Sequence, residues 1–257
     1  MKFVFDIDGT LCFDRMTISD EIKQVLINAE TYGHQVLFAS ARSYRDCLEV
    51  LGPVLNQYPV IGLNGGIIYD KGQLIFEQTI DGTAFQTILD WFGTYNLPFF
   101  VDESFHYSGQ LIHKMPFYSS VDPSKQAQRL SLSDLQHPVK IVAYMGEHED
   151  LVEDTLAQFA NLGVLDLTYD ENEKCLYINP LNINKATSVA HYCNEEFIAF
   201  GNDQNDIDLF KESVYAIQVG DFAGLKQYAD DQVLLTGDYE AALAAKITQV
   251  FADFRGK

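Results

Sequence analysis

Residues 3–11, Phe-Val-Phe-Asp-Ile-Asp-Gly-Thr-Leu, constrain the fold of this chain more than any other stretch. The segment from Lys2 to Ile7 is almost continuously apolar and β-favouring, which is typical of a central parallel strand covered on both faces. Because side chains two apart in an extended chain point the same way, Asp6 and Asp8 are expected to face one crevice. Gly9 lets the backbone turn away directly afterwards. Ligands of open α/β sheets bind at this edge, so we expect a site here.

Two carboxylates that converge at one strand end repel each other, and a cation bound between them relieves that repulsion. Oxygen ligands in a partly hydrated site favour Mg²⁺. The alternative is an ordinary strand-to-turn junction, because Asp-Gly is a common turn pair. Polar residues that follow other strands of the same sheet would favour the cation site.

The composition indicates a well-packed globular protein with a strongly acidic surface. The chain has 257 residues, of which 47% are hydrophobic, enough for one large domain or two unequal ones. The formal net charge of −20 repels nucleic-acid phosphates and anionic membranes. Since no basic cluster offsets this charge, we expect neither nucleic acid nor a membrane as a partner.

The protein is predicted to be soluble and cytoplasmic. The first strand begins at residue 2, which leaves no signal-peptide pattern, and no apolar run approaches membrane-spanning length. The cysteines lack metal-ligand spacing, so buried, reduced thiols are expected rather than disulfides or a zinc site. These cysteines are Cys12, Cys47, Cys175 and Cys193.

Strands and helices alternate over the first 80 residues. Helices are predicted from Ser19 to about Gly33 and from Ser43 to about Leu51, strands over residues 35–40 and 59–63, and a hairpin over residues 67–76. The second strand ends in Ser40-Ala41-Arg42, which places a hydroxyl and a cation at another carboxyl end. Alternatively, Ser40 or Ser43 simply caps the next helix and Arg42 is a solvated surface charge.

The alternation stops near residue 81 and returns near residue 182. Between them we expect helices over residues 83–95 and 147–160, and strands near Phe99 and Leu111 and over residues 139–145, 164–169 and 175–179. This pattern predicts an α+β domain of residues 82–181 inserted into an α/β core of residues 1–81 and 182–257. The core is expected to be a Rossmann-like parallel sheet with helices on both faces. Residues 82–180 contain five Lys and Arg against fourteen Asp and Glu, so the insert is acidic.

The last section carries a second cluster of polar residues after a strand. A helix over residues 185–193 and a strand over residues 197–200 lead into Gly-Asn-Asp-Gln-Asn-Asp at 201–206, which opens a helix through Lys211. A strand over residues 214–219 and a helix over residues 239–254 follow. Acidic residues are favoured at a helix N-terminus. Five consecutive amide or acid side chains nevertheless exceed what capping requires.

Four signals thus stand in a fixed order: Asp6-x-Asp8-Gly-Thr-Leu, Ser40-Ala-Arg42, Asn184-Lys185 and Gly201-Asn-Asp-Gln-Asn-Asp206. Together they resemble the haloacid dehalogenase superfamily of phosphatases. The long insert, preceded by Asn64-Gly65, is similar in particular to the Cof-type members with a type IIB cap domain. The resemblance covers nearly the whole chain, and its first and fourth motifs are the specific ones.

The resemblance implies an Mg²⁺-dependent phosphatase of small phosphomonoesters, such as sugar phosphates, that works through an aspartyl-phosphate. Asp6 is the implied nucleophile, and Asp8 the acid and base that serves the leaving group and then the hydrolytic water. Substrate binding is implied for Ser40, Ala41, Arg42, Lys185 and Asn205, which surround the phosphoryl group.

Two positions depart from the family pattern. Ala41 stands where a glycine is usual, and Asn202 stands where an aspartate usually ligates Mg²⁺. An asparagine offers a neutral amide oxygen instead of a carboxylate. We expect Asp6 and Asp8 to bind the metal, with the third ligand open among Asn202, Asp203 and Asp206.

Two other functions compete with this interpretation. A phosphomutase must hold a bisphosphorylated intermediate, which calls for a basic cap, whereas this insert is acidic. A non-catalytic sugar-phosphate sensor is opposed by the intact Asp6 and Asp8 but favoured by Asn202. Substrate specificity is expected from cap side chains, and the sequence does not rank the candidates. These candidates are His106, Tyr107, His113 and Lys114.

Overall fold

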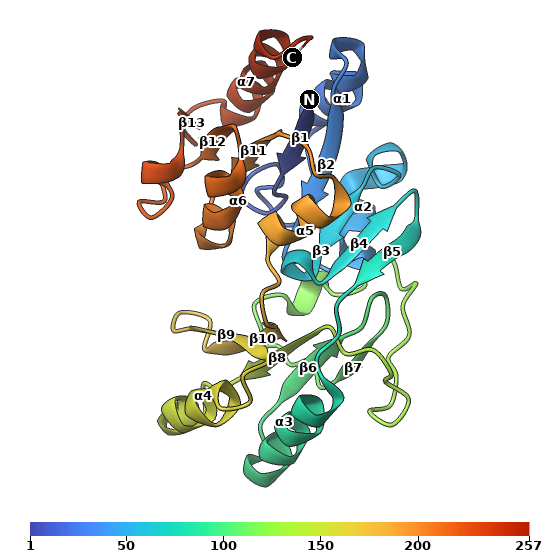
Figure 1. The fold of residues 1–257 in the computed structure, drawn as a ribbon, viewed down its shortest axis with the longest axis vertical. Helices are drawn as coiled ribbons and strands as arrows, with labels where there is room; N and C mark the ends of the chain where they lie inside the picture. Colours follow the sequence, from blue (N-terminus) through green and yellow to red (C-terminus); the bar gives the residue numbers. More distant parts are fainter. Residues whose placement is uncertain (257) are drawn as a thin grey trace.

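The computed structural model of the protein describes residues 1–256 and contains two β-sheets, one above the other (Figure 1). The larger sheet has the strand order β13-β12-β11-β1-β2-β3-β4-β5. Strands β1, β2, β3, β11, β12 and β13 are parallel, and β4 and β5 form an antiparallel hairpin at one edge. The strands are β1 (Lys2–Phe5), β2 (Gln35–Ala39), β3 (Val60–Gly62), β4 (Ile67–Asp70), β5 (Gln73–Glu77), β11 (Phe197–Gly201), β12 (Tyr215–Val219) and β13 (Asp231–Val233).

Helices cover both faces of this sheet because alternate side chains of its central strands point to opposite sides. Phe3 and Phe5 of β1 belong to the core packed under α1, α2 and α7. Val4 belongs to the core packed under α5 and α6 on the other face. These helices are α1 (Asp20–Ile27), α2 (Tyr44–Leu55), α5 (Lys185–Tyr192), α6 (Ile207–Glu212) and α7 (Tyr239–Asp253). The predicted α/β fold class is confirmed.

The smaller sheet is antiparallel, with the order β7-β6-β8-β10-β9. Its strands are β6 (Phe99–Asp102), β7 (Tyr107–Gly109), β8 (Lys140–Tyr144), β9 (Leu165–Asp170) and β10 (Cys175–Pro180). Helices α3 (Gly82–Tyr95) and α4 (Val152–Ala160) pack on one face through a core that includes Ile88, Phe92 and Phe159. The sheet lies within residues 82–181, and the independent folding of that segment stays a prediction.

The boundaries differ from the sequence expectations at several places. The helix that begins at Asp20 ends at Ile27, because a 3₁₀ turn continues to Tyr32 before Gly33 adopts φ +82°. The strand expected near Leu111 is instead β7, and Leu111 packs against the apolar cluster around Phe100. Strand β13 was not predicted, since only Val233 of its three residues is buried. The 3₁₀ helices are η1 (Asn28–Tyr32), η2 (Leu63–Gly65), η3 (Tyr118–Ser120), η4 (Glu149–Leu151), η5 (Gln204–Asp206) and η6 (Lys226–Tyr228).

Local capping follows the sequence closely. Ser19 accepts a hydrogen bond from the backbone N–H of Ile22, and Ser43 accepts one from Asp46, so both serines cap the helices that follow them. All four cysteines are free thiols; Cys12, Cys47 and Cys175 are buried as predicted, whereas Cys193 is half-buried. No helix among residues 1–256 combines the length and apolar character needed to cross a membrane.

A buried charge cluster joins the two sheets. The Arg45 side chain of α2 is fully buried, and its Nη2 donates to Asp102 Oδ1 of β6 at 2.6 Å. Its Nε lies 3.2 Å from Asp46 Oδ1, and Nη1 donates to the Phe105 carbonyl at 3.0 Å. Asp46 Oδ1 also accepts the backbone N–H of Asp122 at 2.7 Å. Arg45 and Asp46 of the core thus bind the insert at three residues, which are Asp102, Phe105 and Asp122.

We predict that Asp102→Asn destabilises the protein strongly. The buried Arg45 would lose one of its two carboxylates, and breaking a buried ion pair costs roughly 3 kcal/mol or more. Urea unfolding followed by circular dichroism measures the change. Glu149→Gln is the control, because Glu149 pairs with Lys174 at 2.7 Å on the exposed surface. A similar midpoint for both variants would show that the Arg45 cluster does not stabilise the fold.

Candidate active site

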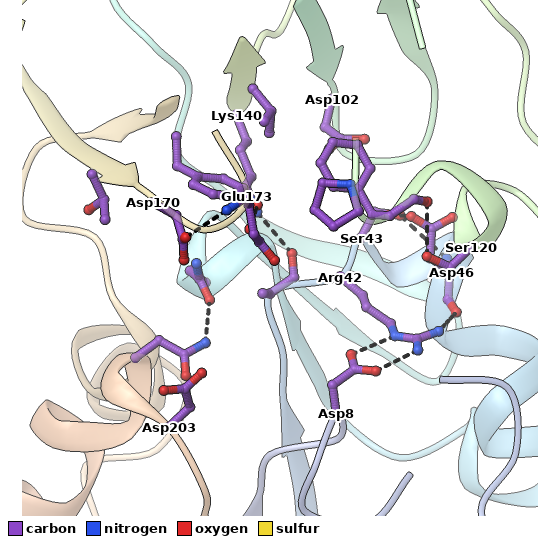
Figure 2. A pocket seen from close by; sticks show the side chains of 18 of the residues that line it. Asp8, Arg42, Ser43, Asp46, Asp102, Ser120, Lys140, Asp170, Glu173 and Asp203 are labelled. Carbon is purple, nitrogen blue, oxygen red and sulfur yellow. Dashed lines mark hydrogen bonds and ion pairs between the residues drawn. The ribbon is translucent and has the colours of Figure 1, made fainter. Parts of the chain in front are cut away.

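A cavity of about 550 Å³ lies between the carboxyl ends of the parallel strands and the smaller sheet (Figure 2). The larger sheet and its loops contribute Asp6, Asp8, Arg15, Ala41, Arg42, Ser43, Asp46, Asn64, Asn202, Asp203, Gln204 and Asn205. The insert contributes Phe100, Asp102, Pro116, Phe117, Ser120, Val121, Lys140, Val142, Thr168, Asp170, Glu173, Tyr177 and Asn179. Asp6 and Asp8 therefore both face the cavity, at the strand edge where a site was expected.

The Lys185 ammonium lies between two buried carboxylates beneath this cavity. Its Nζ donates to Asp6 Oδ1 at 2.6 Å and to Asp206 Oδ1 at 2.7 Å. Asp6 follows β1, Lys185 begins α5, and Asp206 ends η5, so the three side chains come from distant parts of the chain. All three are almost fully buried. This arrangement fixes the Asp6 carboxylate at the end of its strand.

The electrostatics of this group are unusual because two carboxylates share one ammonium. Burial raises the pKa of Asp6 to about 7, against the lowering effect of Lys185, and the nearby Asp206 raises it further. Burial disfavours the charge of Lys185, but Asp206 and Asp6 outweigh it and raise the pKa of the lysine. The ammonium is thus charged at neutral pH, whereas the carboxylate form of Asp6 is disfavoured by burial and by Asp206, and a cation bound beside Asp6 would favour it.

The Asp8 carboxylate is held by Arg42 in a two-point ion pair (Figure 2). Arg42 Nε donates to Asp8 Oδ2 at 2.7 Å, and Arg42 Nη2 donates to Asp8 Oδ1 at 2.6 Å. Arg42 Nη2 also donates to the Arg15 carbonyl at 2.7 Å. The guanidinium predicted to bind substrate therefore positions the predicted acid and base in this structure.

The Asn202 amide packs against the first turn. Gly9 has φ +76°, and a Cβ there would lie 2.2 Å from Asn202 Nδ2, so the close approach requires glycine. The other end of the amide lies 3.0 Å from Asp6 Oδ2, 2.9 Å from the Asp8 carbonyl oxygen and 3.0 Å from Thr10 Oγ1. With its NH₂ group turned that way, the amide donates to all three oxygens. With the amide oxygen in that position, the oxygen faces two other acceptors, Asp6 Oδ2 and the Asp8 carbonyl oxygen, and accepts a hydrogen bond only from Thr10 Oγ1.

This convergence of oxygens fits a hard cation. A carboxylate oxygen of Asp6, the main-chain oxygen of Asp8 and the amide oxygen of Asn202 are ligands of the kind that Mg²⁺ prefers. Among residues 1–256, no three His, Cys, Asp or Glu side chains gather as metal ligands. A cation at this position would therefore rest on one carboxylate and two neutral oxygens.

Three of the predicted metal ligands have hydrogen-bond partners within the protein, and their roles in metal binding stay predictions. Asp206 Oδ1 accepts from Lys185, and its Oδ2 accepts the backbone N–H groups of Asn202 and Asp203. Asp203 lines the cavity and accepts the Gln204 N–H. Asp8 turns its main-chain oxygen, not its carboxylate, toward Asn202. The sequence could not distinguish these cases, because all three are acids beside a strand end.

The predicted phosphate-binding residues fall into two groups. Ala41, Arg42 and Asn205 line the cavity, and the Asn205 amide donates to Asn64 Oδ1 at 3.2 Å. Ser40 is fully buried, and its Oγ accepts the Arg42 N–H at 3.1 Å, which shapes the loop. Their roles in phosphate binding stay predictions.

The cap residues that face the cavity were not predicted. The candidates from the sequence lie elsewhere, for Lys114 pairs with Glu147 on the surface and His106 accepts the Gln128 N–H through Nδ1. The cavity is lined instead by alternate residues of β8 and β10, among them Lys140 and Asn179. On β10 the alternation of polar with apolar residues is a sequence signal for Asn179, whereas β8 is apolar after Lys140 and gives no such signal.

Comparisons with known proteins give a consistent picture. A family model described as haloacid dehalogenase-like hydrolase matches residues 3–240. A 5-amino-6-(5-phospho-D-ribitylamino)uracil phosphatase of Bacillus subtilis is 23% identical over 241 residues, covering 91% of this chain and 86% of that protein.

Solved structures of other proteins superpose on nearly the whole length of this chain. A Thermotoga maritima protein, TM0651, superposes with a TM-score of 0.78 at 20% identity, covering 95% of this chain and 96% of that one. A subclass IIB sugar phosphatase, BT4131, superposes with a TM-score of 0.74 at 15% identity, covering 97% and 98%. At these identities the likeness establishes the fold.

The raised pKa of Asp6 predicts a pH dependence of stability in the metal-free protein. Between the ordinary carboxyl pKa and about 7, the folded state holds more protons on Asp6 than the unfolded state. The Asp6 contribution to the free energy of unfolding is therefore present at low pH and lost as pH rises through about 7. A difference of one pH unit between the folded and unfolded pKa of a carboxyl group corresponds to about 1.4 kcal/mol.

Urea unfolding of wild type and Asp6→Asn in EDTA, from pH 5 to pH 8, measures this effect. Because asparagine does not titrate, Asp6→Asn should gain stability relative to wild type as pH rises. Asp221→Asn, which changes an exposed carboxylate outside the cavity, is the control. A difference between wild type and Asp6→Asn that does not vary with pH would contradict the prediction.

Proposed function

The chain belongs to the haloacid dehalogenase-like hydrolases, and we propose that it is an Mg²⁺-dependent phosphatase that cleaves small phosphomonoesters through an aspartyl-phosphate. The observation that carries the proposal is the Asp6 carboxylate, which Lys185 holds at 2.6 Å beneath the cavity. A nucleophile fixed in this way meets the substrate without first having to be ordered. The predicted family and the hydrolase class agree with the comparisons.

In the first half-reaction, an oxygen of the Asp6 carboxylate attacks phosphorus as the bond from phosphorus to the ester oxygen breaks. The leaving oxygen takes a proton from the Asp8 carboxyl group. Lys185 remains beside Asp6 and offsets negative charge as the phosphoryl group arrives. Asp8 must turn from Arg42 toward the leaving group to do this, since both its oxygens bind the guanidinium in this structure.

In the second half-reaction, the Asp8 carboxylate removes a proton from water, whose oxygen attacks phosphorus. The bond from phosphorus to Asp6 breaks, which releases phosphate and restores the carboxylate.

Asp6, the main-chain oxygen of Asp8 and Asn202 would hold Mg²⁺. The ion supplies positive charge next to the phosphoryl oxygens, which the transition state requires. The neutral Asn202 leaves the site with one carboxylate fewer than the family pattern gives.

Small phosphorylated metabolites are the substrate class that these observations support. The relatives are described as a phosphatase of a ribitylamino compound and as a sugar phosphatase. The cavity volume of about 550 Å³ suits a metabolite rather than a macromolecule. We propose a sugar phosphate or a related polyol phosphate as the substrate.

We predict that Asp6→Asn reduces phosphate release to background, because an amide cannot form the phosphoaspartate. Asp8→Asn should lower turnover by about 10²- to 10⁴-fold, the usual value of an acid or base. Phosphate release is measured on p-nitrophenyl phosphate and a panel of sugar phosphates, with Mg²⁺ and with EDTA.

Asp221→Asn is again the matched control, and circular dichroism confirms that each variant is folded. If folded wild type releases no more phosphate than Asp6→Asn from every ester tested, the phosphatase proposal fails. The rival function, a sugar-phosphate sensor, predicts that result together with tight binding of the same esters.

We predict that Asn202→Asp has opposite effects on the melting temperature without and with Mg²⁺. Asn202→Asp places a carboxylate against two oxygen acceptors, so the metal-free protein should melt at a lower temperature than wild type. Added Mg²⁺ should raise the melting temperature of the variant more than that of wild type.

Melting temperature as a function of Mg²⁺ concentration, without substrate, measures both effects. Asp203→Asn is the control, since the Asp203 carboxylate also lines the cavity but accepts a backbone N–H there. If Mg²⁺ raises the melting temperatures of wild type and Asn202→Asp equally but raises that of Asp203→Asn less, the third metal ligand is Asp203 and not Asn202.

A further inference from the structure

The roof of the cavity is one face of the smaller sheet. On β6, β8, β9 and β10, alternate residues line the cavity, and the residues between them belong to the core under α3 and α4. The cavity-facing pairs are Phe100 and Asp102, Lys140 and Val142, Thr168 and Asp170, and Tyr177 and Asn179. Because strands alternate their side chains, these positions form one continuous surface opposite Asp6.

Lys140 and Asn179 are neighbours on this surface. Ile178 of β10 pairs with Ile141 of β8 in an antiparallel register. Extending that register by one residue places Asn179 opposite Lys140, with Cβ atoms about 5 Å apart. Lys140 Nζ donates to the carbonyl of Ala41 at 3.2 Å, in the loop beside Ser40 and Arg42. The pair therefore lies at the end of the roof nearest the phosphoryl site.

Both side chains have hydrogen-bonding capacity that the described chain does not use. Among residues 1–256, Asn179 Oδ1 is buried without a hydrogen-bond partner. The Lys140 ammonium carries three N–H donors and has one hydrogen-bond acceptor within the described residues, the Ala41 carbonyl. A buried polar atom without a partner costs free energy, so the pair favours a ligand that satisfies both groups.

A hydroxyl group fits these two neighbours. Its oxygen can accept from Lys140 while its hydrogen is donated to Asn179 Oδ1. A phosphate or carboxylate oxygen would satisfy Lys140 but would face Asn179 Oδ1 and the nearby Glu173 as a further acceptor. Glu173 already takes the Tyr177 hydroxyl hydrogen, and Asp170 lines the same wall, so a second anion is disfavoured.

We propose that Lys140 and Asn179 are specificity residues that bind a hydroxyl group of the leaving group, close to the phosphate ester. This inference rests on the proposed phosphatase function and narrows its substrate. The preferred substrate is a polyol or sugar phosphate that bears a hydroxyl near the ester and carries no second anionic group.

Binding to the inactive Asp6→Asn protein tests the proposal without turnover. Calorimetric titrations with Mg²⁺ compare glycerol 3-phosphate, ribose 5-phosphate and glucitol 6-phosphate with ethyl phosphate, which has no such hydroxyl. Asn179→Leu and Lys140→Met, each in the Asp6→Asn background, should weaken binding of the best hydroxylated ester by about 10-fold. Binding of ethyl phosphate should weaken by a clearly smaller factor.

Asn172→Ala is the matched control, because Asn172 is an exposed amide in the turn between β9 and β10. The proposal is overturned if no hydroxylated ester binds more tightly than ethyl phosphate. It is also overturned if Asn179→Leu and Lys140→Met, folded and with melting temperatures near that of the parent, bind the esters as tightly as the parent does. An equal loss of affinity for ethyl phosphate and for the hydroxylated ester would overturn it as well.

Kinetics in the active background separate this proposal from the phosphatase proposal. The same two substitutions should raise KM for the hydroxylated ester by about 10-fold more than they raise KM for p-nitrophenyl phosphate. If the protein hydrolyses p-nitrophenyl phosphate but neither substitution changes KM for the sugar phosphate, the role of Lys140 and Asn179 is refuted and the phosphatase proposal stands. No hydrolysis of any ester, with selective binding retained, would refute the phosphatase and keep the hydroxyl-binding pair.

Discussion

One ammonium between two buried carboxylates organises this protein. Lys185 binds Asp6 at 2.6 Å and Asp206 at 2.7 Å, with all three side chains almost fully shielded from water. Taking these charges out of water is costly, so the arrangement persists only because the surrounding hydrogen bonds satisfy it. Asp206 illustrates this, since its second oxygen takes two backbone N–H groups from the loop that carries Asn202. The same group therefore fixes the proposed nucleophile and shapes the loop that carries the proposed metal ligand Asn202.

The cavity has one wall from each sheet, and a second buried charge group sets the distance between the two sheets. Arg45 and Asp46 of α2 hold Asp102 and the backbone of the insert against the core. This contact keeps Lys140 within 3.2 Å of the Ala41 carbonyl, so the roof and floor of the cavity meet at the predicted phosphate loop. The proposed catalytic and specificity residues thus lie on different sheets, so we expect substitutions in the roof to change substrate choice without altering Asp6.

The sequence predicted the core better than the roof for a physical reason. Buried parallel strands read as continuous apolar runs, and polar residues just beyond them, such as Asp6 and those after Phe200, stand out sharply. Whether an acid binds a cation or a lysine depends on tertiary contacts, so the sequence could not show that Asp206 pairs with Lys185. Short strands such as β7 and β13, and the partners of Arg45, depend on packing between distant segments and left no local signal.

Chemical trapping tests whether Asp6 forms a covalent bond to phosphorus during turnover. Protein incubated with excess phosphomonoester and Mg²⁺ is quenched in acid and reduced with borohydride, which converts a phosphoaspartate to homoserine. Peptide mass spectrometry should then find homoserine at position 6, dependent on the ester and missing from Asp6→Asn. Rapid phosphate release with no homoserine at position 6, or with homoserine at position 8 instead, would contradict the account.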